Sequence, residues 1–277
     1  MFTTKDYKLL IAVLIIFSFA CFPVLNAYKA YAGVKKDIYI KAEGFISRPG
    51  TYKLKRGSRL SDLLEKIWPP NRGAYLKNTA LYRKQLKIDR KVELIGLLRE
   101  ILSLKGLNRG VKSKIKRQFT KLRPLGRVVI HIKNPVLLLN TKGNIRLSNG
   151  DIIVINGKPE GVFVEGAVKD PGKYAYNKGR TFNYYLNEAK ELQTNAVSGF
   201  LYIIRVSGKI QKISTNFIVW NKRKKRWEFS LFEKPRIINA GDIIFVPFNY
   251  GGITAKLTKL ILAVYKRTGV VLNYFPG

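Results

Sequence analysis

One turn occurs twice in this 277-residue chain, and it constrains the fold more than any other feature. The stretch YIKAEGFISRPGTYKLKRG at 39–57 returns as VFVEGAVKDPGKYAYNKG at 162–179. Repetition of this kind predicts two similar modules in tandem. A constant offset of 122 residues relates the matching positions, which are Gly44 and Gly166, Pro49 and Pro171, Gly50 and Gly172, Tyr52 and Tyr174, and Gly57 and Gly179.

Each copy has the pattern of two strands followed by a helix. Alternating apolar residues precede the Pro-Gly turn, at 38–40 and at 162–164, and this period of two indicates a half-buried strand. Pro fixes φ and Gly adopts a positive φ, so the dipeptide turns the chain back on itself. After a second glycine turn, apolar residues at 60–64 and 182–186 have the spacing of a helix.

A second repeated motif closes each module. LSNGDIIVI at 147–155 matches INAGDIIFV at 238–246, and here the offset is only 91 residues. The first copy therefore contains 31 additional residues, the difference between the two offsets. This insertion has to lie between Leu64 and Gly150.

The inserted sequence predicts a basic helical hairpin. Apolar residues at helical spacing form two stretches separated by KGLNRG. Basic residues dominate the segment from Arg83 to Arg127, whose acidic residues are Asp89, Glu93 and Glu100. We expect the buried faces to consist of Val92, Ile95, Leu98 and Leu102 in the first helix and Val111, Ile115, Phe119 and Leu122 in the second.

Three later segments have clear periodicity. GRVVIHI at 126–132 alternates like a strand, and LYIIRVSGKIQKIS at 201–214 predicts a β-hairpin that turns at Ser207 and Gly208. Residues 254–268 predict an amphipathic helix, which at about 1.5 Å per residue is too short to span a bilayer alone. Its apolar face consists of Leu257, Leu260, Ile261 and Val264.

The first 32 residues have the layout of a secretory signal peptide. Two lysines precede an apolar run at 9–25, and Ala30-Tyr31-Ala32 fits the small-x-small rule for cleavage. Cleavage after Leu25-Asn26-Ala27, an uncleaved membrane anchor and, more weakly, a lipoprotein site at Cys21 are the alternatives. Cleavage would remove the chain's one cysteine, so the mature protein would depend on its core for stability.

The formal net charge of +35 indicates an anionic partner. Nucleic acid, anionic lipid or lipopolysaccharide surfaces, and acidic polysaccharide all satisfy this requirement. The leader argues against a role on genomic nucleic acid, so we rank nucleic acid below polysaccharide as a partner. The alternative is a periplasmic protein that binds nucleic acid or the anionic surface of the outer membrane.

The sequence offers little for catalysis. The one histidine, His131, lies in an alternating strand without a signalled Ser, Cys or carboxylate partner. No zinc-ligand spacing, P-loop or dinucleotide fingerprint occurs. Asp151 and Asp242 are interpreted as turn residues that open strands, not as a glycosidase pair. We therefore predict a protein that is not an enzyme and that has no metal site and no cofactor.

Two copies of G-x-x-x-x-P-G-x-Y-x-x-x-x-G, each followed by a short helix and closed by G-D-I-I, resemble the soluble-ligand-binding β-grasp (SLBB) modules of bacterial polysaccharide export proteins. With the hairpin, the C-terminal helix and the leader, residues 37–277 resemble the GfcC-like capsule biosynthesis family. The resemblance implies an α+β fold of two tandem β-grasp (ubiquitin-like) domains, related to the periplasmic modules of Wza-type exporters. It also implies that the C-terminal helix packs on the protein itself.

The resemblance also suggests where a ligand would bind. Family members carry an arginine after a glycine at the exit of the hairpin, lining a groove, and Gly126-Arg127 stands at the matching place. The family's usual Thr before this glycine is Leu125 here. Arg83 and Arg90 are weaker candidates for the same wall. A separate basic patch lies between Trp220 and Trp227, in a stretch that equally fits a solvated hairpin tip, and consists of Lys222, Arg223, Lys224, Lys225 and Arg226.

These observations predict four segments and one role. The segments are a signal peptide at 1–32, a β-grasp domain at 33–157 with a hairpin insert at about 77–123, an SLBB-like β-grasp domain at 158–249, and a C-terminal helix and tail at 250–277. The predicted role is that of a non-enzymatic accessory protein in capsule or exopolysaccharide assembly or export, located in the periplasm, either free or associated with the outer membrane. Its predicted partners are an extracellular or capsular polysaccharide, for which the charge of the protein favours an acidic polymer, the export proteins, or both.

Overall fold

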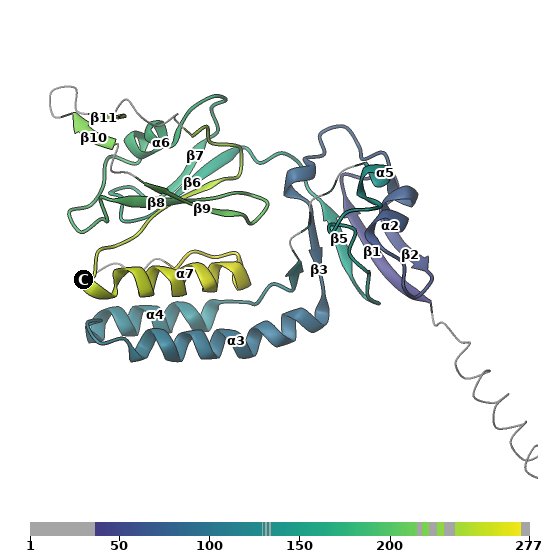
Figure 1. The fold of residues 1–277 in the computed structure, drawn as a ribbon, viewed down its shortest axis with the longest axis horizontal. Helices are drawn as coiled ribbons and strands as arrows, with labels where there is room; N and C mark the ends of the chain where they lie inside the picture. The colour runs from purple at the N-terminus through teal and green to yellow at the C-terminus, as the bar shows by residue number, and fades with distance from the viewer. Residues whose placement is uncertain are drawn as a thin grey trace, which may run out of the picture.

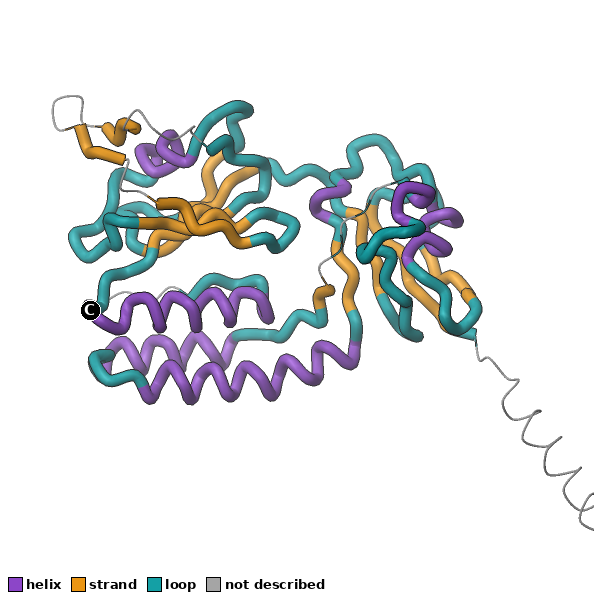
Figure 2. Tube along the Cα trace, in the orientation of Figure 1, coloured by secondary structure: helices purple, strands orange, loops and turns teal. Residues whose placement is uncertain are grey.

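The computed structural model describes residues 37–128, 130, 132, 134–214, 218–221, 226–229 and 236–272. The expected signal peptide, Cys21, His131 and four residues of the basic patch, 222–225, lie outside these ranges. The described chain is α+β, with two five-stranded mixed sheets (Figures 1 and 2).

The first sheet has the strand order β2-β1-β5-β3-β4. β1 and β5 are parallel, and the other neighbours are antiparallel. Helix α2 (Leu60–Ile67) packs its apolar face into the core of this sheet, and the short α5 (Pro135–Leu138) lies beside α2. A 3-10 turn, η1 (Leu76–Asn78), precedes β3. The strands are β1 (Ile38–Gly44), β2 (Gly50–Leu54), β3 (Ala80–Tyr82), β4 (Arg127–Val128) and β5 (Ile152–Ile155).

The second sheet repeats this plan in the order β7-β6-β12-β8-β9, with α6 (Phe182–Glu188) in the place of α2. A separate strand pair, β10 (Ile218–Asn221) and β11 (Arg226–Phe229), aligns Trp220 with Trp227. The two sheets therefore confirm the prediction of tandem β-grasp-like domains in an α+β fold. The five strands are β6 (Gly161–Gly166), β7 (Gly172–Ala175), β8 (Phe200–Ile204), β9 (Ile210–Ser214) and β12 (Ile243–Val246).

The contacts between strands locate the insertion more closely than the sequence does. Tyr82 pairs with Ile152 in the first sheet, and Ile204 pairs with Ile243 in the second, so the offset of 122 holds as far as the end of β3. In the second module, residues 206–209 form a tight turn from β8 to β9. In the first module, residues 84–126 occupy the equivalent place. The helical hairpin thus replaces one β-turn.

The glycine that begins each repeated turn is required by the backbone on both occasions. Gly44 and Gly166 have φ values of +90° and +93°, where residues with a side chain are strained. A Cβ atom on Gly44 would lie 2.2 Å from the carbonyl oxygen of Ile155, and one on Gly166 would lie 2.0 Å from that of Val246. The first strand of each module therefore approaches the closing strand too closely for any other residue.

The repeated tyrosine closes the Pro-Gly turn. The hydroxyl of Tyr52 donates to the carbonyl oxygen of Arg48 at 2.5 Å, and the hydroxyl of Tyr174 donates to that of Asp170. Both acceptors lie four residues before the tyrosine. One tyrosine per module therefore fixes the shape of the turn that identifies the repeat.

We expect the Tyr174→Phe variant to lose about 1 kcal/mol of free energy of unfolding, because it removes one hydrogen bond and leaves the ring in place. Urea denaturation measures the difference. Tyr39→Phe is the matched control, since the Tyr39 side chain is exposed and no hydrogen bond of its hydroxyl occurs among the described residues. An equal loss in both variants would contradict the role of the turn hydroxyl.

The inserted hairpin belongs to the core of the second module. It consists of α3 (Lys84–Ser103) and α4 (Arg109–Lys121), and α3 packs against α7 (Thr254–Thr268). A 3-10 turn, η2 (Gly251–Ile253), leads into α7. Figure 1 shows the resulting layers, in which α7 lies between the hairpin and the second sheet. Buried hairpin residues, among them Ile101 and Ile115, join one cluster with Ile261 of α7 and the second sheet.

The expected buried face of the first hairpin helix is wrong at Val92 and Ile95, while Leu98 packs against the core as expected. Val92 and Ile95 are 71% and 49% exposed, whereas Leu94 and Ile101 are buried. Helix α3 carries apolar residues on two faces, and α7 covers the face on which Leu94, Leu97, Leu98 and Ile101 follow one another at helical spacing. In α4, Val111 and Ile115 are buried as expected.

Helix α7 spans the residues expected from the sequence, and its apolar side chains are turned into the protein. No helix within the described ranges combines the length and the apolar character that a membrane crossing requires. The residues of the expected apolar face, all buried, are Leu257, Leu260, Ile261 and Val264.

Candidate functional site

The segment that leaves the hairpin is held by three elements. The backbone amide of Leu125 donates to the carbonyl oxygen of Arg267 in α7 at 2.8 Å, and Arg90 of α3 donates from Nη1 to the carbonyl oxygen of Leu125 at 2.6 Å. The amide of Arg83 donates to the carbonyl oxygen of Gly126 at 2.8 Å. A Cβ atom on Gly126 would lie 2.1 Å from the Arg83 carbonyl oxygen, so glycine is required here too.

Arg127 follows this glycine and reaches the second module. Its Nη2 donates to the carbonyl oxygen of Val206, in the turn between β8 and β9, at 3.0 Å. Its Nε is buried and has no hydrogen-bond partner among the described residues. The guanidinium thus bridges the two modules and keeps a donor available inside the protein.

A pocket of about 430 Å³ lies at this junction. Its walls come from α3, the start of β4, the β8–β9 turn and the C-terminal part of α7. The pocket lies where the insertion of the first module meets the equivalent turn of the second. The lining residues are Arg90, Leu125, Arg127, Gly208, Lys209, Ile210, Tyr265, Lys266 and Gly269.

Four cations and no acidic residue line the pocket. Burial lowers the pKa of Arg90, while Glu93 raises it and Arg267 lowers it. Burial also raises the pKa of the Tyr265 hydroxyl, which Arg127 lowers and Asp242 raises. Arginine stays charged under these influences, and the tyrosine stays a neutral hydroxyl at neutral pH. The site can therefore offer several charge-assisted hydrogen bonds to an anion.

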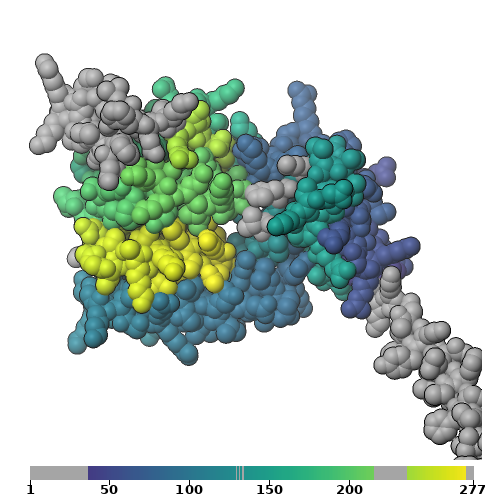
Figure 3. All heavy atoms as spheres, viewed as in Figure 1, coloured from purple at the N-terminus to yellow at the C-terminus, as the bar shows by residue number. Residues whose placement is uncertain are grey.

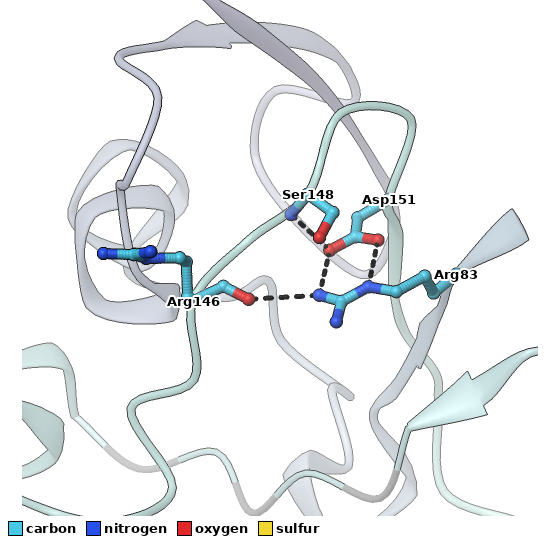
Figure 4. Close-up of polar contacts among 4 residues, drawn as sticks. All are labelled: Arg83, Arg146, Ser148 and Asp151. Atoms are coloured by element: carbon cyan, nitrogen blue, oxygen red, sulfur yellow. Dashed lines mark hydrogen bonds and ion pairs between the residues drawn. The ribbon is translucent and has the colours of Figure 1, made fainter. Parts of the chain in front are cut away.

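Arg83, the third expected groove residue, does not line the pocket and has a structural role instead. Figure 4 shows its bidentate ion pair with Asp151, whose side chain is fully buried. Nε and Nη2 of Arg83 lie 2.9 and 2.8 Å from Oδ1 and Oδ2 of Asp151. Nη2 also donates to the carbonyl oxygen of Arg146 at 3.0 Å, and the amide of Ser148 donates to Asp151 Oδ2 at 2.9 Å. Arg83 therefore fastens β3 to the turn before β5.

The second module contains the same ion pair, between Arg205 and Asp242. Asp242 Oδ2 also accepts from the amide of Asn239 at 2.7 Å. Arg205 divides its donors among Asp242, Gln211 and the carbonyl oxygen of Ile237. Burial raises the pKa of Asp242, and the Asn239 amide and Arg205 oppose this effect. The aspartate of each G-D-I-I motif thus opens a strand and also neutralises a partly buried arginine.

The structure thus brings together two of the three expected arginines, Arg90 and Arg127. The side chains of Lys222, Arg223, Lys224 and Lys225 lie outside the described residues, and Arg226 begins β11. The sequence analysis missed Lys209 and Tyr265 as site residues. Strand pairing in the structure places Lys209-Ile210 at the positions equivalent to Gly126-Arg127, a correspondence that the repeated motifs do not reveal.

No group of three or more His, Cys, Asp or Glu side chains gathers anywhere in the described ranges in a way that could hold a metal ion. The polar side chains that line the pocket are four cations and the Tyr265 hydroxyl. Such groups suit recognition of an anionic ligand.

Comparisons with known proteins identify the first module. The SLBB domain family matches residues 43–96, from β1 into α3, so this match lies in the first module, and the resemblance to SLBB proteins of capsule polysaccharide export is confirmed. The particular similarity is to two proteins from Escherichia coli, both named polysialic acid transport protein KpsD. Each is 26% identical over 186 residues, which cover 64% of this chain and 32% of the relative. The chain thus spans about a third of the length of these relatives.

Proposed function

We propose that this protein is a non-enzymatic periplasmic accessory protein of capsule or exopolysaccharide assembly or export, of the GfcC-like type, and that it binds acidic polysaccharide in the pocket around Arg127. The SLBB match and the similarity to a polysialic acid transport protein support the process. The cationic pocket supports the class of ligand.

The observation that carries this proposal is the arrangement of Arg90, Arg127, Lys209 and Lys266 around one pocket at the junction of the modules. The volume of about 430 Å³ is in the range of about 300–1,000 Å³ typical of small-ligand sites. Acidic sugars carry carboxylates, which arginine binds with directional, charge-assisted hydrogen bonds.

The proposed chain has four segments. Residues 1–32 are a cleaved signal peptide, 33–157 and 158–249 are the two β-grasp domains, and 250–277 are the C-terminal helix and tail. The export proteins are the second proposed partner, in contact with the protein while the polymer occupies the pocket.

We expect the Arg127→Ala variant to bind polysialic acid oligomers about 10- to 100-fold more weakly than the parent, because a hydrogen bond to a charged group contributes about 1.5–3 kcal/mol. Isothermal titration calorimetry across a salt series measures the affinity. Competition with DNA of matched charge density separates a glycan site from general attraction to polyanions.

Arg56→Ala is the matched control, because Arg56 is an exposed arginine of the β2–α2 turn, away from the pocket lining. It removes the same charge and is expected to leave the affinity nearly unchanged. Thermal unfolding of Arg127→Ala checks that loss of the bond to Val206 has not unfolded the protein. Equal losses in both variants, or equal displacement by DNA, would refute the glycan pocket and leave a nucleic acid or the export proteins as the partner.

A further inference from the structure

A second, larger hollow lies on the hairpin itself. It has a volume of about 830 Å³, and residues 84–124 supply its whole lining. Figure 3 shows the hairpin at the outer edge of the molecule, with α7 on its inner side. We call this hollow the outer groove. It is separate from the pocket around Arg127, with which it shares no lining residue.

The floor of the outer groove is apolar and partly open to solvent. Ile88 and Ile95 are 53% and 49% exposed, and Val92, one helical turn after Ile88, is the most exposed apolar residue of α3. An exposed apolar strip beside an apolar hollow marks a surface that is covered by a partner. The floor consists of Ile88, Leu94, Ile95, Leu98, Phe119 and Leu122.

The charged residues that line the groove are all basic. No acidic residue is in the lining, and none of the rim cations forms an ion pair with a described residue. Two acidic residues of α3 are engaged with α7 instead, where Glu93 pairs with Arg267 and Glu100 pairs with Lys256. These two carboxylates therefore pair with α7 and do not neutralise the cations of the groove. The rim consists of Lys84, Lys87, Lys91, Lys116 and Arg123.

The composition of the groove favours a lipid over a protein as its occupant. Protein interfaces are depleted in lysine and centred on aromatic residues and arginine, whereas four of the five rim cations are lysines and Phe119 is the one aromatic residue of the floor. Lysine lays its methylene chain along apolar surface and keeps its ammonium group in the polar layer, as at membrane interfaces.

We propose that the outer groove binds an anionic phospholipid, whose acyl chain lies against the floor and whose headgroup phosphate lies between the rim cations. This contact holds the hairpin on an anionic membrane surface. The apolar face of α7 is buried in the protein, so the hairpin supplies the exposed apolar surface for this contact. The proposal is independent of the polysaccharide pocket.

The test uses the full chain with vesicles of phosphatidylcholine alone and of phosphatidylcholine mixed with phosphatidylglycerol. Amide hydrogen exchange locates the contact, and vesicle sedimentation gives the affinity. We expect slower exchange in residues 84–98 only with the anionic vesicles. The Lys87→Gln/Lys91→Gln variant is expected to bind them about 30-fold more weakly, since each basic residue near an anionic surface contributes about 1 kcal/mol.

Lys105→Gln/Lys121→Gln is the matched control, because both lysines are exposed on the hairpin and neither lines the groove. It is expected to change the affinity much less. Ile95→Asn tests the floor and is expected to weaken binding about tenfold without unfolding the protein.

Three results would overturn the proposal. One is unchanged exchange of residues 84–98 with anionic vesicles, which would place any membrane contact elsewhere in the chain. Another is an equal loss of affinity in the two lysine variants. The third is protection of the same residues by a synthetic acidic amphipathic helix but not by vesicles, which would assign the groove to a protein partner.

Discussion

The Ile101→Ala variant will unfold with a free energy about 2–5 kcal/mol lower than that of the parent protein, the usual cost of emptying a core position. Ile101 lies in the insertion of the first module, and its side chain is fully buried. Its cluster is that of the second sheet and α7. We therefore expect amide exchange to accelerate in β6, β8 and β12 more than in β1 and β5. Urea denaturation and hydrogen exchange measure the two effects.

Ile88→Ala is the matched control, because it removes the same atoms from the same helix at a site that is 53% exposed. Surface substitutions of this kind usually change the free energy of unfolding by about 0.5 kcal/mol or less. Equal losses at the two positions would contradict the shared core. Faster exchange confined to the first sheet would contradict the assignment of the hairpin to the second module.

The Arg205→Met variant will lose about 3–5 kcal/mol of free energy of unfolding at neutral pH, because it leaves a buried carboxylate without its cation. The side chain of Asp242 is 1% exposed and cannot turn to water. The backbone amides of Asn239 and Val206 still donate to it, but neutral donors do not replace a guanidinium. Chemical denaturation at several pH values measures the loss.

The loss in Arg205→Met will depend on pH in a defined direction. Burial already raises the pKa of Asp242, and removal of Arg205, which lowers it, raises it further. A carboxyl whose pKa is higher in the folded state than in the unfolded state favours folding when it is protonated. Its contribution to the free energy of unfolding declines as the pH rises from the ordinary aspartate pKa through the higher pKa of the folded state. The variant will therefore be closest to the parent in acid and furthest from it near neutrality.

Lys169→Met serves as the control for this variant. It breaks the ion pair with Glu191 in the same module, where both side chains are about half exposed. Exposed pairs of this kind contribute about 0–1 kcal/mol. A loss in Arg205→Met that matches this control, or that does not change with pH, would show that Asp242 does not need its partner.

The repeated motifs were sufficient to predict most of the architecture. The Pro-Gly turns and the G-D-I-I motifs lie at sites where backbone geometry leaves little choice, as the close approach of Gly166 to Val246 shows. Two offsets therefore located two sheets and one insertion. The buried face of α3 was not predictable in the same way, because Val92 and Ile95 are as apolar as Leu94 and Ile101. Which face is buried depends on α7, a partner distant in sequence.

The candidate pocket was predictable only in part, for a related reason. The resemblance to a known family drew attention to Arg127, and Arg90 followed from its place on the first hairpin helix. Lys209 and Tyr265 come from a turn and a helix of the second module, and only the folded chain brings them to the same pocket. Arg83 differs from Arg90 and Arg127 because it forms an ion pair with the buried Asp151 and does not line the pocket.

The position of α7 between the hairpin and the second sheet also affects how the molecule reaches its final state. The hairpin is among the earlier segments of the folded chain, but the helix that covers its inner face is among the later ones. Contacts of such large sequence separation form slowly and leave apolar surface open in the meantime. During synthesis, Ile101 and its neighbours stay exposed until the residues of α7 have been made. A chaperone that shields this face would protect the protein over that interval.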